Sequence, residues 1–389
     1  MPQYTFECEV LTPLFLGGAE AREAPELRAP SLRGAMRYWY RALLGGSLLT
    51  LAALHEAESE LFGKAEGGGA LATRLRLKGE MRSQTYDRDR AIRTPQGDYL
   101  PTGKDYLLWS MYSTGRPGTS RYQPPRQYVE PGAKFDFILS AKLDEEILKK
   151  GEAAFWLLAN LGAIGARANR GAGSFQAVNP KAAVPFRIAA SVENLQSYLH
   201  AGIRACLDQV GVNWRAFSGD ETAEYDILHP DFCEIYIVAD TLKGWDSYRA
   251  ALEGLGSRLR DYRTHARTRG IGKSDHDAVL QWFERGGKGP LLKRPVFGLP
   301  IPFRYSEGGP ADVILHEEGD RRGSPLHMRL TRLTNGHYVG ILTLFKSRFL
   351  PDGAKLKLQE RKWTAHPPPD YAVIQDFIQT FPVHQGVPL

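Results

Sequence analysis

The sequence predicts an α+β fold made of two tandem ferredoxin-like, RRM-like domains with large insertions. The first observation is the order of elements expected in the first half, β-α-(α)-β-β-α-β, which is the order of the ferredoxin-like fold. The second is a Pro-containing boundary at 179–185, after which strands and helices begin again. The third is the length of 389 residues, which corresponds to two or three domains. We therefore expect one domain at 1–182 and an elaborated copy of it at 183–389.

Hydrophobic periodicity locates the elements of the first domain, because alternation indicates strands and a period of 3.6 indicates helices. Ser31 is the expected N-cap of the first helix, and Gly45-Gly46 the stop signal. Acidic residues at 144–146 suit the positive N-terminus of the last helix. The predicted strands are 4–10, 70–78, 135–142 and 174–178, and the predicted helices are 32–44, 48–62 and 144–161.

Residues 80–132 interrupt this order. They are rich in Gly, Pro, Arg and Tyr and show little periodicity. The segment is too long for a plain connection, so we expect an inserted subdomain or a functional loop.

The second domain repeats the pattern with larger insertions. A strand is expected at Phe186, and an acidic loop between the first helix and the next strand. The predicted helices are 192–210, 245–269, 275–284 and 371–381, and the further predicted strands are 234–239, 312–316, 326–332 and 338–345.

Composition excludes several classes of protein. The three cysteines form no CxxC pair and the ten histidines form no HxxxH or HExxH motif, so we expect no disulfide scaffold, no metal site and no cofactor. No window approaches 18 consecutive apolar residues, and the N-terminus does not resemble a signal peptide. We expect a soluble, cytoplasmic protein without a membrane partner.

The formal net charge of +6 conceals a strong segregation of charge. Basic residues dominate segments 82–93, 116–126 and 258–273, whereas 220–234 carries six acids and no base. Local fields of this kind govern the binding of polyanions, although a set of solvated faces would look the same. Segment 258–273 could contact RNA phosphates or an acidic protein face; its candidate residues are Arg258, Arg263, Arg267 and Arg269.

The helix at 32–44 is the most informative candidate site. At 100° per residue, its apolar residues Leu32, Met36, Trp39 and Leu43 share one face. A second face presents Arg33, Arg37, Tyr40 and Arg41. Arginine donates to phosphates and tyrosine can stack on a base, so this stripe favours RNA over a solvated face. The helix itself offers no acid to neutralise these arginines at i±4.

A Gly-rich loop follows the helix at 144–161. Residues 162–175 contain Gly165, Arg167, Arg170, Gly171 and Gly173. Glycine lets a backbone approach a ligand closely, and small residues with two arginines form a cationic, amide-rich concavity suited to phosphates. The loop lacks the Gly-Lys-Ser/Thr of a Walker motif and follows a helix instead of a strand. A tight connection is the plain alternative.

Catalytic residues are sparse. Asp87 and Asp89 lie in the Arg-rich part of 80–132, where an acid could serve in strand cleavage, but salt bridges to neighbouring arginines are the simpler interpretation. His316, His327 and His337 fall on expected strands and are interpreted as structural. We expect no catalytic residue.

Several motifs resemble the RAMP superfamily of CRISPR proteins, and most closely its first-numbered subunit family of the type III-B Cmr effector complex. Residues 12–18, 25–28 and 31–43 carry the most specific part of this resemblance. The Gly-rich loop, residues 321–327 and residues 344–350 add to it. Asn169 and Ala172 depart from the pattern, where another basic residue and an aromatic would be expected.

The resemblance implies two ferredoxin-like RAMP domains and a non-catalytic, crRNA-binding subunit. Such a subunit would cap the crRNA 3′ end, contact target RNA and neighbour other RAMP subunits of the complex in antiviral defence. Cleavage of the target would belong to those neighbours. The alternative is a RAMP-type, metal-independent endoribonuclease that processes CRISPR repeat RNA, and a third possibility is a pure protein scaffold.

Overall fold

The computed structural model describes most of the chain. The described residues are 2–18, 24–48, 50–64, 67–93, 99–142, 144–218, 221–264, 271–285, 290–303, 311–315, 321–350, 356–358, 362–363 and 370–389. No helix among them is long and apolar enough to cross a bilayer.

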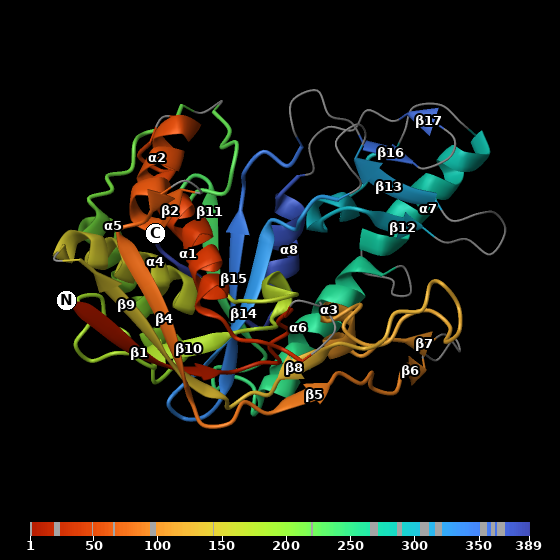
Figure 1. The fold of residues 1–389 in the computed structure, drawn as a ribbon. Helices are drawn as coiled ribbons and strands as arrows, with labels where there is room; N and C mark the ends of the chain where they lie inside the picture. The colour runs from red at the N-terminus through yellow and green to blue at the C-terminus, as the bar shows by residue number, and fades with distance from the viewer. Residues whose placement is uncertain are drawn as a thin grey trace.

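The first domain contains a four-stranded antiparallel sheet with the order β10-β1-β9-β4. In chain order this is strand four, one, three, two, the ferredoxin-like arrangement. Helices α1 and α4 cover one face (Figure 1), where Phe6 and Phe137 each lie 4.7 Å from Phe155 of α4. The bounds are β1 Gln3–Val10, α1 Ala29–Leu44, α2 Leu51–Phe62, β4 Leu71–Lys78, β9 Lys134–Ala141, α4 Glu145–Leu161 and β10 Phe175–Val178.

A second four-stranded sheet has the order β14-β15-β11-β18. Its strands, with α6 and α8, again follow β-α-β-β-α-β, and the strand order is the same as in the first sheet. Leu255 of α6 lies against Gly340 of β15. The two tandem ferredoxin-like topologies therefore confirm the predicted α+β fold. The bounds are β11 Cys233–Ala239, α6 Tyr248–Arg263, β14 Leu326–Arg332, β15 Tyr338–Phe345, α8 Ala372–Gln379 and β18 Val383–Val387.

Further elements surround these two ferredoxin-like frames, each of which consists of a four-stranded sheet and its two helices. Helix α5 (Val192–Val210) packs on α4, with Gly202 directly under the ring of Trp156. A small sheet of the order β12-β13-β16-β17 lies beside α7 on the far side of the second frame (Figure 1). The bounds are α7 Ile271–Arg285, β12 Ile301–Phe303, β13 Ala311–Leu315, β16 Leu356–Leu358 and β17 Lys362–Trp363.

Two local predictions are wrong, and one strand was missed. Phe186 forms an isolated bridge to Asn179 and no strand, because its ring packs between Phe6 and Phe155. Helix α1 begins at Ala29, with Arg28 as N-cap and no side-chain cap. Strand β18 was not predicted. The boundary at 182/183 stays a prediction.

The insertion, residues 80–132, is a subdomain that bridges both frames. Strand β5 (Ser83–Thr85) pairs with β8 (Gln127–Val129), and β6 (Ile92–Arg93) with β7 (Tyr99–Leu100). Its helix α3 (Gly103–Leu107) docks on α6 so closely that a Cβ on Gly256 would meet the Gly103 carbonyl at 1.9 Å. Glu253 accepts from the amides of Gly103 and Lys104 at 2.8 and 3.0 Å.

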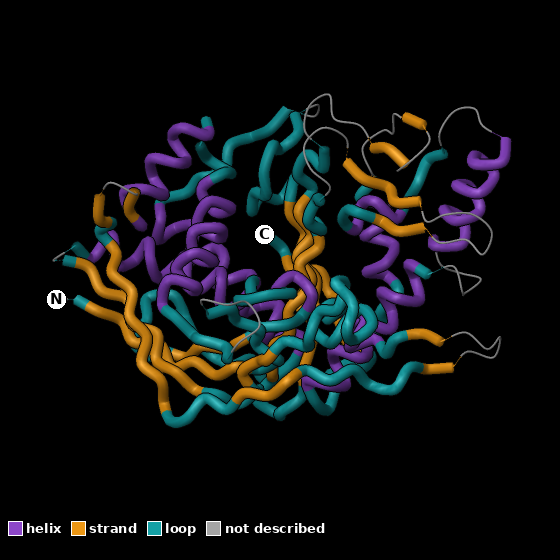
Figure 2. Tube along the Cα trace, turned by 45° about the vertical axis from the view of Figure 1, so that its right-hand side comes forward, coloured by secondary structure: helices purple, strands orange, loops and turns teal. Residues whose placement is uncertain are grey.

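The two frames share one continuous core, and Figure 2 shows their strands and helices merging into one body. Arg329 of β14 is 1% exposed and donates to the carbonyls of Ala159 and Phe175 in the first domain. Arg332, also on β14, makes two bonds to Glu9 of β1 at 2.7 and 2.9 Å. The Gly-rich loop joins the same strand through the Gly171 amide and the Met328 carbonyl, at 2.9 Å. Strand β14 thus fixes the position of the loop.

Candidate nucleic-acid interface

The arginine stripe of α1, formed by Arg33, Arg37 and Arg41, faces the end of α2. Arg33 donates to the carbonyl of Phe62, and Arg37 to that of Gly63 at 2.6 Å. Glu58 neutralises the other charges: its Oε1 lies 2.7 Å from Arg37 Nε and 2.9 Å from Arg41 Nη1. The acid that α1 lacks is therefore supplied by α2. Burial lowers the pKa of Arg33, and neighbouring Arg37 lowers it further.

The stripe borders an open groove of about 1310 Å³ between α1, α2 and β4. Arg33 and Arg37 line one side, and His55 and Lys64 contribute further basic character. No acid other than Glu60 lines this groove among the described residues. The groove can accept a polyanion.

Tyr40 does not belong to this surface. It is 2% exposed, and its ring packs edge-on against Phe62 at 5.8 Å. The helical wheel places it next to Arg33, but α2 covers that side of the helix. The prediction that Tyr40 lines an RNA groove is therefore corrected: its ring belongs to the core.

Backbone conformation shapes the Gly-rich loop. Gly165, Gly171 and Gly173 have φ values of 87°, 84° and 63°, which favour glycine. A Cβ on Gly173 would lie 1.8 Å from the carbonyl of Ile164. Arg167 adopts the same left-handed region, with φ 61°, and caps the short 3-10 helix η1 (Ala168–Arg170). Gly171 and Gly173 are buried, so these two glycines shape the loop without forming a ligand surface.

Arg167 and Arg170 extend from the loop to different neighbours. Arg167 Nε donates to the carbonyl of Trp109 in the insertion at 2.9 Å. Arg170 Nη2 donates to the carbonyl of Phe297 at 3.0 Å. Arg263, at the end of α6, places its guanidinium carbon 5.3 Å from the centre of the Phe297 ring. We name Arg167, Arg170 and Arg263 the arginine junction, because loop, insertion and α6 meet there.

The arginine junction concentrates positive charge. The pKa of Arg170 is lowered to about 9, mainly because the guanidinium is buried and also because Arg263 and Arg167 are nearby. Burial also lowers the pKa of Arg167, together with the charges of Arg321 and Arg126. In the described part of the chain, none of the three junction arginines forms an ion pair with a carboxylate.

Two guanidinium nitrogens of the junction stand out. Arg170 Nη1 and Arg263 Nε are buried, and neither has a hydrogen-bond partner among the described residues. Buried donors of this kind are normally satisfied by protein, water or an ion. An anion such as a phosphate would supply both an acceptor and a counter-charge.

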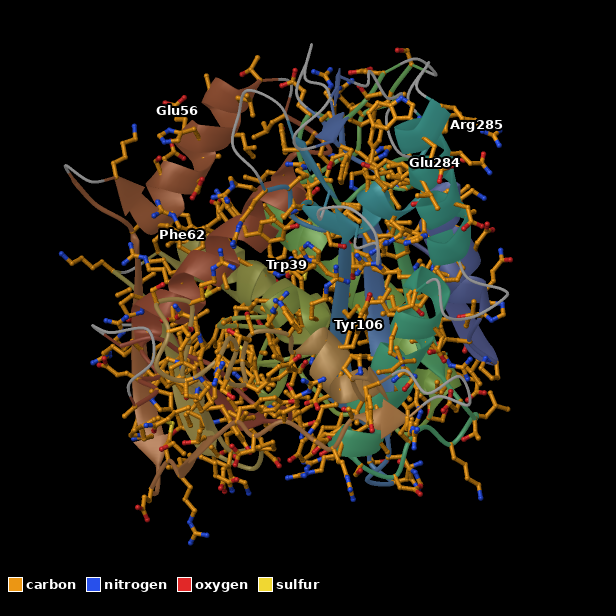
Figure 3. All side chains as sticks on the ribbon, turned by 90° about the vertical axis from the view of Figure 1, so that its right-hand side faces the viewer. Trp39, Glu56, Phe62, Tyr106, Glu284 and Arg285 are labelled. Atoms are coloured by element: carbon orange, nitrogen blue, oxygen red, sulfur yellow. The ribbon has the colours of Figure 1, made fainter. Side chains whose placement is uncertain are left out.

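The arginine junction and the arginine stripe are separate regions. In Figure 3, Tyr106 beside the junction and Phe62 beside the stripe lie on opposite sides of Trp39.

Other arginines of segment 258–273 differ from this pattern. Arg258 is engaged by Asp240 at 2.7 Å, by the Thr380 carbonyl at 2.8 Å and by the Phe381 ring at 5.1 Å. These contacts tie α6 to the second sheet and α8, so the candidate interface no longer includes Arg258. Arg267 and Arg269 lie outside the described residues.

A polar cluster beside the loop was not predicted from the sequence. Tyr38 Oη donates to Asp226 at 2.7 Å and lies 3.5 Å from His327 Nε2, which is 3.2 Å from Asn169 Nδ2. Burial lowers the pKa of His327 to about 4; Asp226 opposes this shift and Arg170 adds to it. His327 has the partners expected of a structural histidine. The residues come from four distant segments, which no local sequence pattern connects.

All but one of the remaining sequence candidates lie in the described region. Asp89 pairs with Lys104 at 2.7 Å, in line with the salt-bridge interpretation, although the partner is a lysine. Asp87 is exposed. His337 lies 3.2 Å from Asp246, and His316 falls outside the described residues.

Comparison with known proteins identifies relatives of this chain. A profile of the RAMP superfamily matches residues 7–176. The CRISPR system Cmr subunit Cmr1-2 of Pyrococcus furiosus is 32% identical over 185 residues, covering 45% of this chain and 95% of the relative. The Cmr subunit Cmr1-1 of the same organism is 26% identical over 353 residues, covering 89% and 88%.

Solved structures show the same fold. The apo crystal structure of Cmr1 from Pyrococcus furiosus aligns over 100% of this chain and 99% of that chain, with a TM-score of 0.59 and 20% identity. A chain of the type III-B Cmr-beta complex bound to cognate target RNA and AMPPnP, in the presence of ssDNA, aligns over 96% and 97%, with a TM-score of 0.52 and 13% identity.

Proposed function

This chain belongs to the Cmr1 family of the RAMP superfamily, and from that premise we propose that it is a non-catalytic, crRNA-binding subunit of a type III-B Cmr complex. It would cap the crRNA 3′ end, contact the target RNA and neighbour other RAMP subunits in the cytoplasm. The observation that carries the proposal is the arginine junction, with its buried, unpaired guanidinium nitrogens and no carboxylate partner in the described region.

RNA phosphate is the ligand that fits the arginine junction. A guanidinium fork donates to phosphate oxygens, and the charge-assisted bonds offset the cost of burying the cation. The groove beside Arg33 and Arg37 offers a second basic surface for the same strand or for the target RNA. The similar chain of the Cmr-beta complex comes from a complex bound to cognate target RNA, which supports an RNA role here.

Nuclease mapping of the assembled complex tests the proposal. The chain is purified with the other Cmr subunits and crRNA, and the 3′-terminal nucleotides are probed with a single-strand nuclease. Wild-type chain should protect the 3′ end, whereas the combined variant Arg167→Ala, Arg170→Ala and Arg263→Ala should expose it. Unchanged protection by that variant, or protection confined to another part of the crRNA, would refute the assignment.

The polar cluster of Tyr38, Asp226, His327 and Asn169 supports one second candidate. These groups form a chain of contacts beside the Gly-rich loop, from Asp226 through Tyr38 and His327 to Asn169. Acid-base groups at such a loop are what a metal-independent endoribonuclease requires. Labelled CRISPR repeat RNA, incubated with the chain with and without EDTA, separates the two functions. Specific cleavage lost in His327→Ala and Tyr38→Phe would establish the nuclease; intact RNA with wild-type chain would exclude it for that substrate.

A further inference from the structure

The insertion presents one exposed tryptophan on a rigid aromatic base. Trp109 is 55% exposed, although its ring meets Tyr112 edge-on at 5.7 Å. Tyr112 is buried and stacks at 6.5 Å on Tyr86, which is also buried. Tyr112 therefore supports one edge of the tryptophan, while about half of the Trp109 side chain remains exposed to solvent.

Two arginines lie beside this aromatic column. Arg167 of the Gly-rich loop donates to the Trp109 carbonyl, and Arg88 lies over the Tyr112 ring at 5.2 Å. Arg167 has no carboxylate partner among the described residues. An apolar protein surface placed on Trp109 would bury this charge without compensation, which is costly. A strand that offers a π-face and a phosphate together would satisfy both groups.

The local backbone holds Trp109 in place. Ser110, which follows the tryptophan, has φ 70°, and Arg167, its cationic neighbour, has φ 61°. Both residues therefore lie in the left-handed region. Strained backbone persists where the surroundings determine it, and it clusters at binding sites. Side chains fixed in advance lose little entropy when a ligand binds.

We propose that Trp109 is a stacking platform for an unpaired base of the bound RNA, with Arg167 beside it to meet an adjacent phosphate. This inference rests on the proposed RNA-binding function and gives the insertion a role within it. Stacking on an aromatic ring is tolerant of sequence, so the platform would hold a nucleotide without reading its identity.

Two probes separate stacking from charge. Fluorescein-labelled single-stranded oligoadenylate offers bases and phosphates, whereas labelled inorganic polyphosphate offers charge alone. Trp109→Ala in the full chain should weaken oligoadenylate binding by about 5- to 100-fold and leave polyphosphate binding unchanged. Trp109→Phe, which keeps an aromatic ring on Tyr112, should recover most of the loss. Arg170→Ala with Arg263→Ala should weaken both probes.

The controls make each outcome decisive. Tyr99, 70% exposed on β7 of the same insertion, is the matched aromatic, and Tyr99→Ala should leave both probes unchanged. Equal losses for Tyr99→Ala and Trp109→Ala, or equal losses of Trp109→Ala on both probes, would overturn the platform. Normal RNA binding by Trp109→Ala would also overturn it without touching the proposed function; loss of subunit assembly in that variant would then assign Trp109 to a protein contact. Failure of wild-type chain to bind RNA would refute the proposed function itself.

Discussion

Arg167 and Ser110 are the two non-glycine residues with left-handed backbone in the described part of the chain, and they contact each other. Arg167 Nη2 lies 3.5 Å from Ser110 Oγ, while φ is 61° at the arginine and 70° at the serine. One belongs to the Gly-rich loop and the other to the insertion, which are far apart in the sequence. The contact therefore joins the two segments that we propose hold the RNA.

Substitution of Arg167 by Gly and by Ala separates strain from charge. Both variants remove the guanidinium, so both should weaken RNA binding equally. Glycine tolerates φ 61° whereas alanine retains the strain, so Arg167→Gly should be more stable than Arg167→Ala by about 1 kcal/mol. Urea unfolding and RNA titration of the same two samples measure both effects. Equal stability would argue against backbone strain, and unequal affinity against a purely electrostatic role.

Glu58 controls the charge of the arginine stripe. Glu58→Gln removes the counter-charge of Arg37 and Arg41, so RNA binding should strengthen and depend more steeply on salt. Replacing Arg33, Arg37 and Arg41 together by Ala should have the opposite effect on both quantities. Fluorescence anisotropy at several salt concentrations provides the measurement. If neither variant changes the affinity, the stripe serves only to join α1 to α2.

Replacing Arg329 should lower the free energy of unfolding more than replacing Arg332 on the same strand. Arg329→Met leaves the buried carbonyls of Ala159 and Phe175 without donors and should cost about 2–4 kcal/mol in the free energy of unfolding. Arg332→Ala breaks a partly exposed pair with Glu9 and should cost about 1 kcal/mol or less. Both residues lie on β14 and face the first domain, so they form a matched pair in urea unfolding. Equal costs would contradict this account of how the domains are joined.

His327 should make the fold sensitive to acid. Its pKa is lowered by burial to about 4, below the ordinary 6.5, so the unfolded chain binds its proton first as pH falls. The stability that neutral His327 contributes is fully present above pH 6.5. The free energy of unfolding should fall by up to about 3 kcal/mol as the pH approaches 4. The charged neighbours are Asp226 and Arg170, with Tyr38 on α1. His327→Asn should flatten the decline of the unfolding free energy over this window; an unchanged decline would exclude His327 as its source.

Regular elements were predictable where local pattern determines them. Strand β14 occupies the predicted residues, and α4 begins one residue after its cap Asp144, which accepts from the amides of Glu146 and Ile147. Strand β18 escaped prediction because Val383–Val387 contains His, Gln and Gly, and its half-exposed residues pair only with the distant β11.

The candidate site was only partly predictable, because its residues are brought together by long-range packing. The glycines and arginines of the Gly-rich loop were visible in the sequence. Tyr40 was assigned to the wrong surface because a helical wheel does not show that α2 covers that side. Trp109 and the polar cluster around His327 were missed, because Arg167 beside the tryptophan and Asn169 beside the histidine come from distant segments of the chain.

The salt dependence of RNA affinity tests the central claim most directly. The slope of log affinity against log salt counts the phosphates neutralised. Arg170→Ala with Arg263→Ala should reduce the magnitude of that slope by roughly 1–2, whereas Arg258→Ala, whose side chain is already paired with Asp240, should leave it at the wild-type value. A wild-type slope in the double variant, or an equal reduction in Arg258→Ala, would contradict the assignment of RNA phosphate to the arginine junction.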